Sequence, residues 1–138
     1  MTPLSKKEER LLSNLEMNQD LIEELAAEPV HVELIQQAMD EENMLHRMVK
    51  LVGTNSGKTY CFANSQINLP ALPPKLQDTL MTGNGGLGRL LQAADIHMER
   101  EILARTVPSD EEIRRDYIIR SGDDELARIS ETFYRASF

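Results

Sequence analysis

The sequence contains a single cysteine, Cys61, and no apolar run long enough to cross a membrane. One cysteine excludes a disulfide within the chain and is typical of the reducing cytoplasm, where we expect this protein to reside. A membrane-spanning helix needs about 18 consecutive apolar residues, so no membrane span is expected. The N-terminal segment MTPLSKKEERLL has no long apolar stretch behind its lysines, which argues against a secretory signal peptide.

Positively charged side chains are also scarce. The chain has 15 lysines and arginines against 23 acidic residues, and its net charge is −8. This excess of negative charge would repel phosphates, so no nucleic-acid partner is expected, and any anionic ligand requires a local basic pocket. With 138 residues, of which 41% are apolar, the chain has the size of a single domain, residues 1–138, with one core.

Hydrophobic periodicity predicts an α+β fold around an antiparallel sheet of about five or six strands. Alternation is typical of half-buried strands, and a spacing of three to four residues is typical of helices. Turn-forming residues between the strands place most of them in hairpins, which makes the sheet antiparallel. The expected strands are residues 30–36, 44–52, 58–67, 96–106, 117–120 and 126–133. The expected helices are residues 5–15, 18–27, a short helix ending near 81, and 87–95.

The glycine-rich segment MTGNGGLGRLLQ, residues 81–92, has the spacing of a dinucleotide-binding loop without its context. Gly83, Gly85 and Gly88 satisfy G-x-G-x-x-G, but a helix rather than a strand is expected before them, which argues against a Rossmann site. The segment GTNSGKT, residues 53–59, has one residue too few between its glycines for a P-loop and fits a hairpin turn. Backbone amides at 86–88 remain available to a carboxylate, and the alternative is a plain connector between helices.

Two charged residues interrupt the apolar faces of expected strands. In MLHRMVKLV, Arg47 shares a face with leucine and valine, and in LARISETF, Glu131 shares a face with isoleucine and phenylalanine. A buried charge is costly unless it is paired or used. Arg47 is therefore a candidate anion-binding residue, and Glu131 is a candidate acid whose protonation is altered by its surroundings. The alternatives are a structural pair between Arg47 and Glu131, or faces that are exposed to solvent.

Other residues with reactive or charged side chains form no recognisable site. The three histidines lack metal-ligand spacing, so no metal is expected. Cys61 is expected to be a packed thiol within a strand. Arg114 and Arg115 are expected at a solvent-exposed strand end, where they could help to draw an anion toward the site.

Four segments, taken in order along the chain, carry a family resemblance. They are LLSNLEMNQDLIEEL (11–25), HRMVKLV with YCFANSQINLP (46–70), GGLGRLL (85–91) and RRDYIIRSGDDELARISETF (114–133). Their order and spacing resemble those of the chorismate pyruvate-lyases, and together they span nearly the whole chain. The resemblance implies a chorismate lyase-like fold, in which helices pack on one side of an antiparallel sheet and the site lies beneath helix–loop flaps.

The resemblance also implies roles for five positions. Arg47 would bind a carboxylate of the substrate, and the backbone at Leu87 and Gly88 would hold a carboxylate from the other side. Met17 would flank the ligand. Glu131 would be the catalytic acid, acting with Arg47 and assisting departure of the ether oxygen when protonated. The implied reaction converts chorismate to 4-hydroxybenzoate and pyruvate for prenylated quinone biosynthesis, and it needs no cofactor because it aromatises the ring.

One departure and two other functions accompany this prediction. Asn64 stands where better-known relatives have an arginine, which removes a nearby positive charge. The first alternative is a non-enzymatic domain that binds an aromatic or carboxylate small molecule, because the same fold resembles the effector domains of certain bacterial transcription regulators. The second is a structural protein in which Arg47 and Glu131 only pair with each other.

Overall fold

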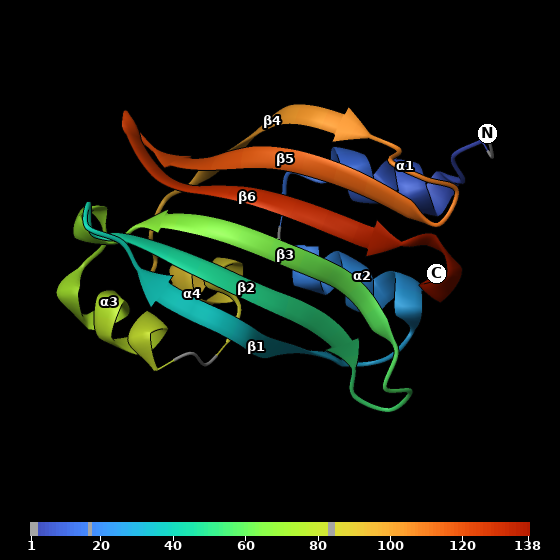
Figure 1. The fold of residues 1–138 in the computed structure, drawn as a ribbon, viewed down its shortest axis with the longest axis horizontal. Helices are drawn as coiled ribbons and strands as arrows, with labels where there is room; N and C mark the ends of the chain where they lie inside the picture. Colours follow the sequence, from blue (N-terminus) through green and yellow to red (C-terminus); the bar gives the residue numbers. More distant parts are fainter. Residues whose placement is uncertain (1–2, 17, 83–84) are drawn as a thin grey trace.

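A computed structural model describes residues 3–16, 18–82 and 85–138 of the chain. Within these ranges, six strands form one antiparallel sheet with the order β1-β2-β3-β6-β5-β4 (Figure 1). The strands are β1 (Val30–Met39), β2 (Met44–Gly53), β3 (Thr59–Asn68), β4 (Glu99–Thr106), β5 (Glu112–Ser121) and β6 (Asp124–Tyr134). The first three strands and the last three each form a meander, and the pairing of β3 with β6 joins the two meanders.

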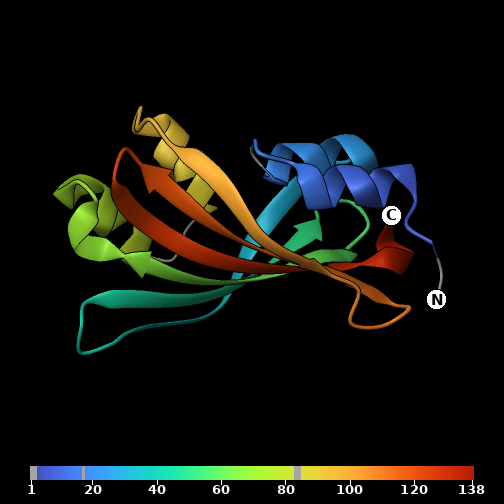
Figure 2. The ribbon, with the colours of Figure 1, turned by 90° about the horizontal axis from the view of Figure 1, so that it is seen from above.

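Four α-helices of the described residues lie on one side of this sheet (Figure 2). They are α1 (Lys6–Ser13), α2 (Asn18–Ala26), α3 (Pro74–Met81) and α4 (Leu87–Ala93). The first two precede the sheet, and the other two connect its two meanders. Short 3-10 helices follow β3 (Leu69–Ala71) and β6 (Arg135–Ser137). No helix in the described part of the chain is long and apolar enough to cross a membrane.

Two apolar clusters fill the space between the helices and the sheet. One cluster lies under α3 and α4 and includes Leu45, Ile67 and Leu91. The other lies under α1 and α2 and includes Leu11 and Phe133. All five side chains are completely buried. Each cluster contains residues of β2, β3, β5 and β6, so each helix pair packs across both meanders at its own end of the strands. A boundary between the two clusters remains near the middle of the sheet.

The first helix is capped by its own sequence and bound to the segment that follows the last strand. The Ser5 hydroxyl accepts a hydrogen bond from the Glu8 backbone N–H, and the Glu8 carboxylate accepts one from the Ser5 backbone N–H, which is a capping box. The Glu8 carboxylate also pairs with Arg135, with 2.6 Å between Oε2 and Nε. The Arg135 hydrogen bond lowers the pKa of Glu8. The ion pair therefore attaches α1 to the far end of the chain.

The predicted fold class is confirmed, as are the antiparallel sheet and the placement of the helices on one side. The turn predicted for GTNSGKT is also confirmed. The Gly53 N–H donates to the Lys58 carbonyl at 2.8 Å, and the Gly57 N–H donates to the Gly53 carbonyl at 2.9 Å. Gly57 has a φ of 74°, which favours glycine. The glycines of this segment therefore serve a hairpin turn.

The expected bounds of several strands differ from the observed ones. The strand expected over 117–120 is longer, because β5 begins at Glu112 and extends to Ser121. The charged residues on both faces of this strand conceal its alternation. Val30, Val32 and Leu34 of β1 lie on one face, because their partners on β2 are Gly53, Leu51 and Val49, and the register shifts only after Leu34. Leu34 lies on this edge strand and is 41% exposed. The strand expected over 96–106 begins at Glu99.

A carboxylate closes the turn between β2 and β3. Glu28 accepts hydrogen bonds from the backbone N–H groups of Asn55 and Ser56, each at 3.0 Å. The hydroxyls of Ser56 and Tyr60 donate to the same carboxylate, each at 2.6 Å. The bonds from the Ser56 and Tyr60 hydroxyls are the main reason that the pKa of Glu28 falls from 4.5 to about 2.

Glu28→Gln should destabilise the protein at neutral pH, with an effect that shrinks as the pH falls from 4.5 toward about 2. The folded-state pKa is depressed, so the contribution of the carboxylate is complete above the unfolded-state pKa and is lost as the pH falls through the folded-state value. Urea unfolding of the parent and the variant across this range measures the effect. Glu41→Gln, in the exposed turn between β1 and β2, is the control. A stability difference that does not change with pH would contradict the prediction.

Candidate functional site

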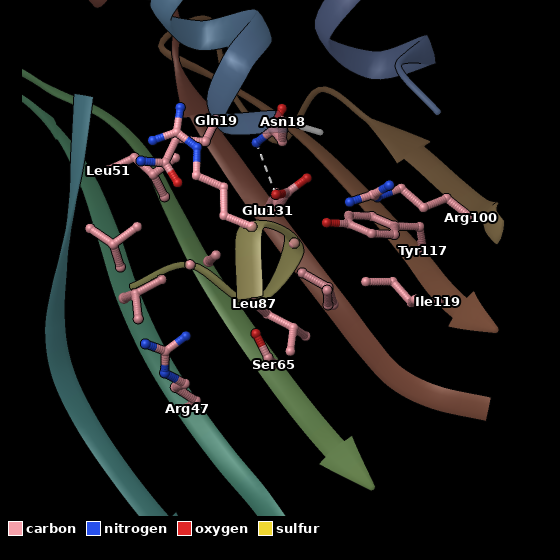
Figure 3. Close-up of a pocket in the computed structure, with 17 residues that line it drawn as sticks. Asn18, Gln19, Arg47, Leu51, Ser65, Leu87, Arg100, Tyr117, Ile119 and Glu131 are labelled. Carbon is pink, nitrogen blue, oxygen red and sulfur yellow. Dashed lines mark hydrogen bonds between the residues drawn. The ribbon is translucent and has the colours of Figure 1, made fainter. Parts of the chain in front are cut away.

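A cavity of about 70 Å³ lies between the inner face of the sheet and the segments that cover it (Figure 3). Its cover consists of Asn18 and Gln19 from α2 and of residues 86–89 around the start of α4. Its floor is formed by β2, β3, β6 and β5. Val32 of β1 and Arg100 of β4 complete the wall on the two outer sides. The cavity thus collects residues from every strand of the sheet.

The register of the sheet places the floor side chains in two adjacent rows. In the strand order β2, β3, β6, β5, the first row is Arg47, Ser65, Ile129 and Tyr117. In the same order, the second row is Val49, Ala63, Glu131 and Arg115. The β3 members of the rows, Ser65 and Ala63, have the smallest side chains. The central strand therefore leaves space between larger neighbours, and this space is the cavity.

Arg47 connects the floor of the cavity to its cover. It is 2% exposed, and its Nη2 donates a hydrogen bond to the Gly85 carbonyl at 2.5 Å. Gly85 has a φ of 81°, a conformation that favours glycine. Burial lowers the pKa of Arg47 below its ordinary value, and the guanidinium stays charged at neutral pH. A buried cation therefore stands at the junction of β2 and the glycine segment.

Glu131 is bound on both of its carboxylate oxygens. Its Oε1 accepts a hydrogen bond from the Arg115 Nε at 2.8 Å, and its Oε2 accepts one from the Asn18 Nδ2 at 2.9 Å. Glu131 and Arg115 are 4% and 1% exposed, so this is a buried ion pair. The Arg115 Nη1 donates to the Asn14 carbonyl at 2.5 Å, and its guanidinium lies 4.6 Å from the centre of the Tyr117 ring.

The pKa values of Arg115 and of the neighbouring Tyr117 are both shifted. Burial alone would lower the pKa of Arg115, but the charge of Glu131, its hydrogen bond to Arg115 and the contributions of Tyr117 and Cys61 together outweigh burial, and the pKa is raised. Burial, reinforced by the charge of Glu131, also raises the pKa of the Tyr117 hydroxyl. Arg115 is therefore permanently charged and Tyr117 is neutral at physiological pH. Cys61 is a packed thiol, as predicted, and burial raises its pKa well above the ordinary value.

Side-chain contacts hold the two parts of the cover, α2 and the start of α4, in place. The Arg89 Nη2 pairs with Asp20 at 2.8 Å and with Glu23 at 2.5 Å. The Gln19 Nε2 donates to the Val30 carbonyl at 2.8 Å, which places α2 against β1. A methyl group on Gly86 would lie 3.0 Å from the Gln19 Oε1, so glycine allows the two parts of the cover to approach closely.

The residues predicted to form a site meet in one cavity. Arg47, Leu87, Gly88 and Glu131 all line it, and their roles as ligand contacts remain predictions. Met17, predicted to flank the ligand, lies outside the described residues, as do Gly83 and Asn84 of the glycine segment. Asn64 is exposed on the opposite face of the sheet and does not line the cavity. The predicted loss of a nearby charge at Asn64 therefore does not concern this cavity.

The prediction for Arg115 is wrong. It was expected at a solvent-exposed strand end, but it is buried and forms an ion pair with Glu131. The alternative of a structural pair between Arg47 and Glu131 is also wrong, because Glu131 pairs with Arg115 instead. Arg114 is exposed, as predicted, and pairs with Asp116. The signal for Arg115 was present, because it lies in the alternating row Ile113, Arg115, Tyr117 and Ile119.

Sequence reasoning also missed Asn18, Gln19, Tyr117 and Arg100. Arg100 had a signal, since alternation places it on the same face of the strand expected over 96–106 as Ile96, Met98 and Ile102. The two polar residues of α2 had none, because they are distant in sequence from the strands that they face. Among the described residues, no group of three or more histidine, cysteine, aspartate or glutamate side chains could hold a metal ion.

Solved structures share this fold at low sequence identity. PhnF from Mycobacterium smegmatis matches with a TM-score of 0.64 and 10% identity, over 91% of this chain and 67% of that one. A transcriptional regulator of the GntR family from Bacillus cereus matches with a TM-score of 0.54 and 8% identity, over 79% of this chain and 94% of that one. No protein-family model and no curated protein sequence matches the chain. The fold is chorismate lyase-like.

The prediction of an enzyme is wrong. The similar structure from Bacillus cereus is a transcriptional regulator of the GntR family rather than a lyase. The contacts of Glu131 agree with this correction. A general acid must present a proton to its substrate, whereas both oxygens of this carboxylate accept N–H bonds from the protein. The predicted lyase reaction and its place in quinone biosynthesis are withdrawn with it.

Glu131→Gln should lower the free energy of unfolding by about 3–5 kcal/mol, because it leaves the Arg115 charge buried without a counter-charge. Combining it with Arg115→Met should recover part of this loss, since the double variant contains no unpaired buried charge. Urea unfolding of the parent, both single variants and the double variant gives the coupling free energy.

The exposed pair of Arg114 and Asp116, on the same strand, is the matched control. The corresponding cycle with Arg114→Gln and Asp116→Asn should give a coupling below about 1 kcal/mol. Equal coupling for the buried and the exposed pair would contradict the structural importance of Glu131.

Proposed function

We propose that this chain is a binding domain for a small molecule with a carboxylate group, which it holds without transforming. The cavity charge is the observation that carries this proposal. Among the described residues, three arginines and one glutamate line the cavity. Arg89 pairs with Asp20 and Glu23, and Glu131 pairs with Arg115, so Arg47 and Arg100 supply the positive charge of the cavity. The whole chain carries −8. A basic cavity in an acidic protein favours an anionic ligand, because the cationic side chains are concentrated where a small molecule can reach them.

Arg47 is the residue proposed to hold the carboxylate. A guanidinium presents a planar set of donors that matches a carboxylate in two parallel hydrogen bonds. Arg47 is buried, so its contact with an anion is weakly screened by solvent. The backbone of Leu87 and Gly88 lines the same cavity and is proposed to contact the ligand from the cover. Glu131 is proposed to position α2 through Asn18, rather than to exchange a proton with the ligand.

The size of the cavity favours a short ligand. A cavity that holds a benzene ring has a volume of about 150 Å³, roughly twice the 70 Å³ present here. A short aliphatic acid fits the arrangement as it stands, whereas an aromatic acid requires the cover to move. The resemblance to effector domains of transcription regulators supports a sensing role for such binding, and the likeness to a GntR-family regulator agrees with it.

Butyrate should raise the melting temperature of the parent protein more than butyramide, which has a similar shape and no charge. Binding to the folded state alone stabilises a protein by about 2.7 kcal/mol at a ligand concentration 100 times the Kd. Arg47→Gln should abolish the difference between the two compounds, and Arg47→Lys should retain part of it because one cationic donor remains. Differential scanning fluorimetry measures the shifts, and 4-hydroxybenzoate tests the larger ligand.

Arg128→Gln is the matched control, because the Arg128 side chain is 56% exposed and pairs with Glu125 away from the cavity. It should respond to butyrate as the parent does. Circular dichroism verifies that each variant is folded. Equal shifts for the acid and the amide, or an undiminished response of folded Arg47→Gln protein, would refute the proposal.

A further inference from the structure

Arg100 reaches the same cavity from the side opposite Arg47. It lies on the edge strand β4, where it pairs with Ile119 of β5. Arg47 lies on β2, on the other side of the two central strands β3 and β6. Figure 3 shows Arg100 extending inward beside Tyr117, and Arg47 on the far side of the cavity. The two cationic side chains thus approach one enclosed space from separate directions.

Arg100 has no partner among the residues that the structure describes. Its Nε is buried and forms no hydrogen bond. The other arginines around the cavity differ in this respect. Arg89 binds carboxylates of α2, Arg115 binds Glu131, and Arg47 binds the Gly85 carbonyl. The Arg100 side chain is partly buried, and a buried N–H donor without an acceptor is costly to the fold. Arg100 therefore contributes a binding group for which the described residues provide no acceptor.

The nearby carboxylates are engaged elsewhere. Glu99 and Glu101, its neighbours in sequence, are exposed and pair with His97 and Arg120 respectively. Glu131, the acidic residue lining the cavity, accepts from Arg115 and Asn18 on its two oxygens. None of these three carboxylates is therefore left to pair with Arg100.

We propose that the ligand is a short dianion, with one carboxylate at Arg47 and a second anionic group at Arg100. This inference rests on the proposed function and specifies the class of its ligand. The part of the ligand between the two groups would pass over Ile129 and Ile119, so it is apolar or uncharged. A single carboxylate could satisfy only one of the two arginines, which makes Arg100 the residue that distinguishes dianions from monoanions.

Isothermal titration calorimetry with matched acids tests this assignment. Succinate, glutarate and adipate are compared with butyrate, valerate and hexanoate, which have the same chain lengths and one carboxylate fewer. The best dicarboxylate should bind the parent protein roughly 10- to 100-fold more tightly than its matched monocarboxylate, as one additional charge-assisted contact predicts. Arg100→Gln should remove this preference, and it should weaken the binding of monocarboxylates less than Arg47→Gln does. Arg47→Gln should weaken the binding of both.

Arg105→Gln, an exposed arginine on the same strand, is the control and should keep the preference. The melting temperature of ligand-free Arg100→Gln protein should not fall, because the variant loses a buried Nε–H group that has no acceptor. A lower melting temperature would indicate a structural role for Arg100 and would overturn the inference.

Two further outcomes would also overturn it. One is a dicarboxylate preference that survives in Arg100→Gln, and the other is inorganic phosphate binding as tightly as the best dicarboxylate, which would indicate one compact anion between the arginines. If monocarboxylates bind through Arg47 with no preference for dicarboxylates, only this inference fails. If no carboxylate binds, the proposed function fails with it.

Discussion

The buried ion pair between Glu131 and Arg115 is the interaction on which the arrangement of this molecule depends. It joins the adjacent strands β5 and β6 on the inner face of the sheet. Asn18 bonds to the same carboxylate, and Arg115 bonds to the Asn14 carbonyl between α1 and α2. The first two helices are therefore docked through polar contacts as well as through the apolar cluster beneath them. Apolar packing alone would allow the helices to shift along the sheet, whereas these hydrogen bonds specify one position for α2 over the cavity.

The cavity exists because of which residues lie next to one another across the sheet. Ala63 and Ser65 have short side chains on the central strand β3, with Arg47 on one side and Glu131 on the other. No single strand contains this combination. The antiparallel register brings the small residues and the charged ones into the same two rows, and the two pairs of helices cover the rows from both ends. A shift of one residue in the register would turn every one of these side chains to the other face.

Sequence reasoning located the fold and part of the site because both follow from local patterns. Arg47 and Glu131 were recognisable as charges within apolar rows, and the hairpins had turn-forming residues between them. Arg115 obeys the same rule, but charged residues also occupy the opposite face of its strand, so the row was read as exposed surface. The partner of Glu131 could not be derived at all, because it depends on the pairing of β5 with β6 and on helix docking. Asn18 lies 113 positions from Glu131, and no local pattern reports a contact of that kind.

The hydrogen bond between Arg47 and the Gly85 carbonyl makes the glycine segment an internal competitor for any anion that reaches this guanidinium. An incoming oxygen that takes the place of this carbonyl would exchange one acceptor for another, so the free energy gained is the difference between the two bonds. Affinity at this cavity would then depend on how firmly the chain holds Gly85 in place, as well as on the ligand. A substitution in the segment that never touches the ligand could therefore tune the threshold concentration at which the cavity fills.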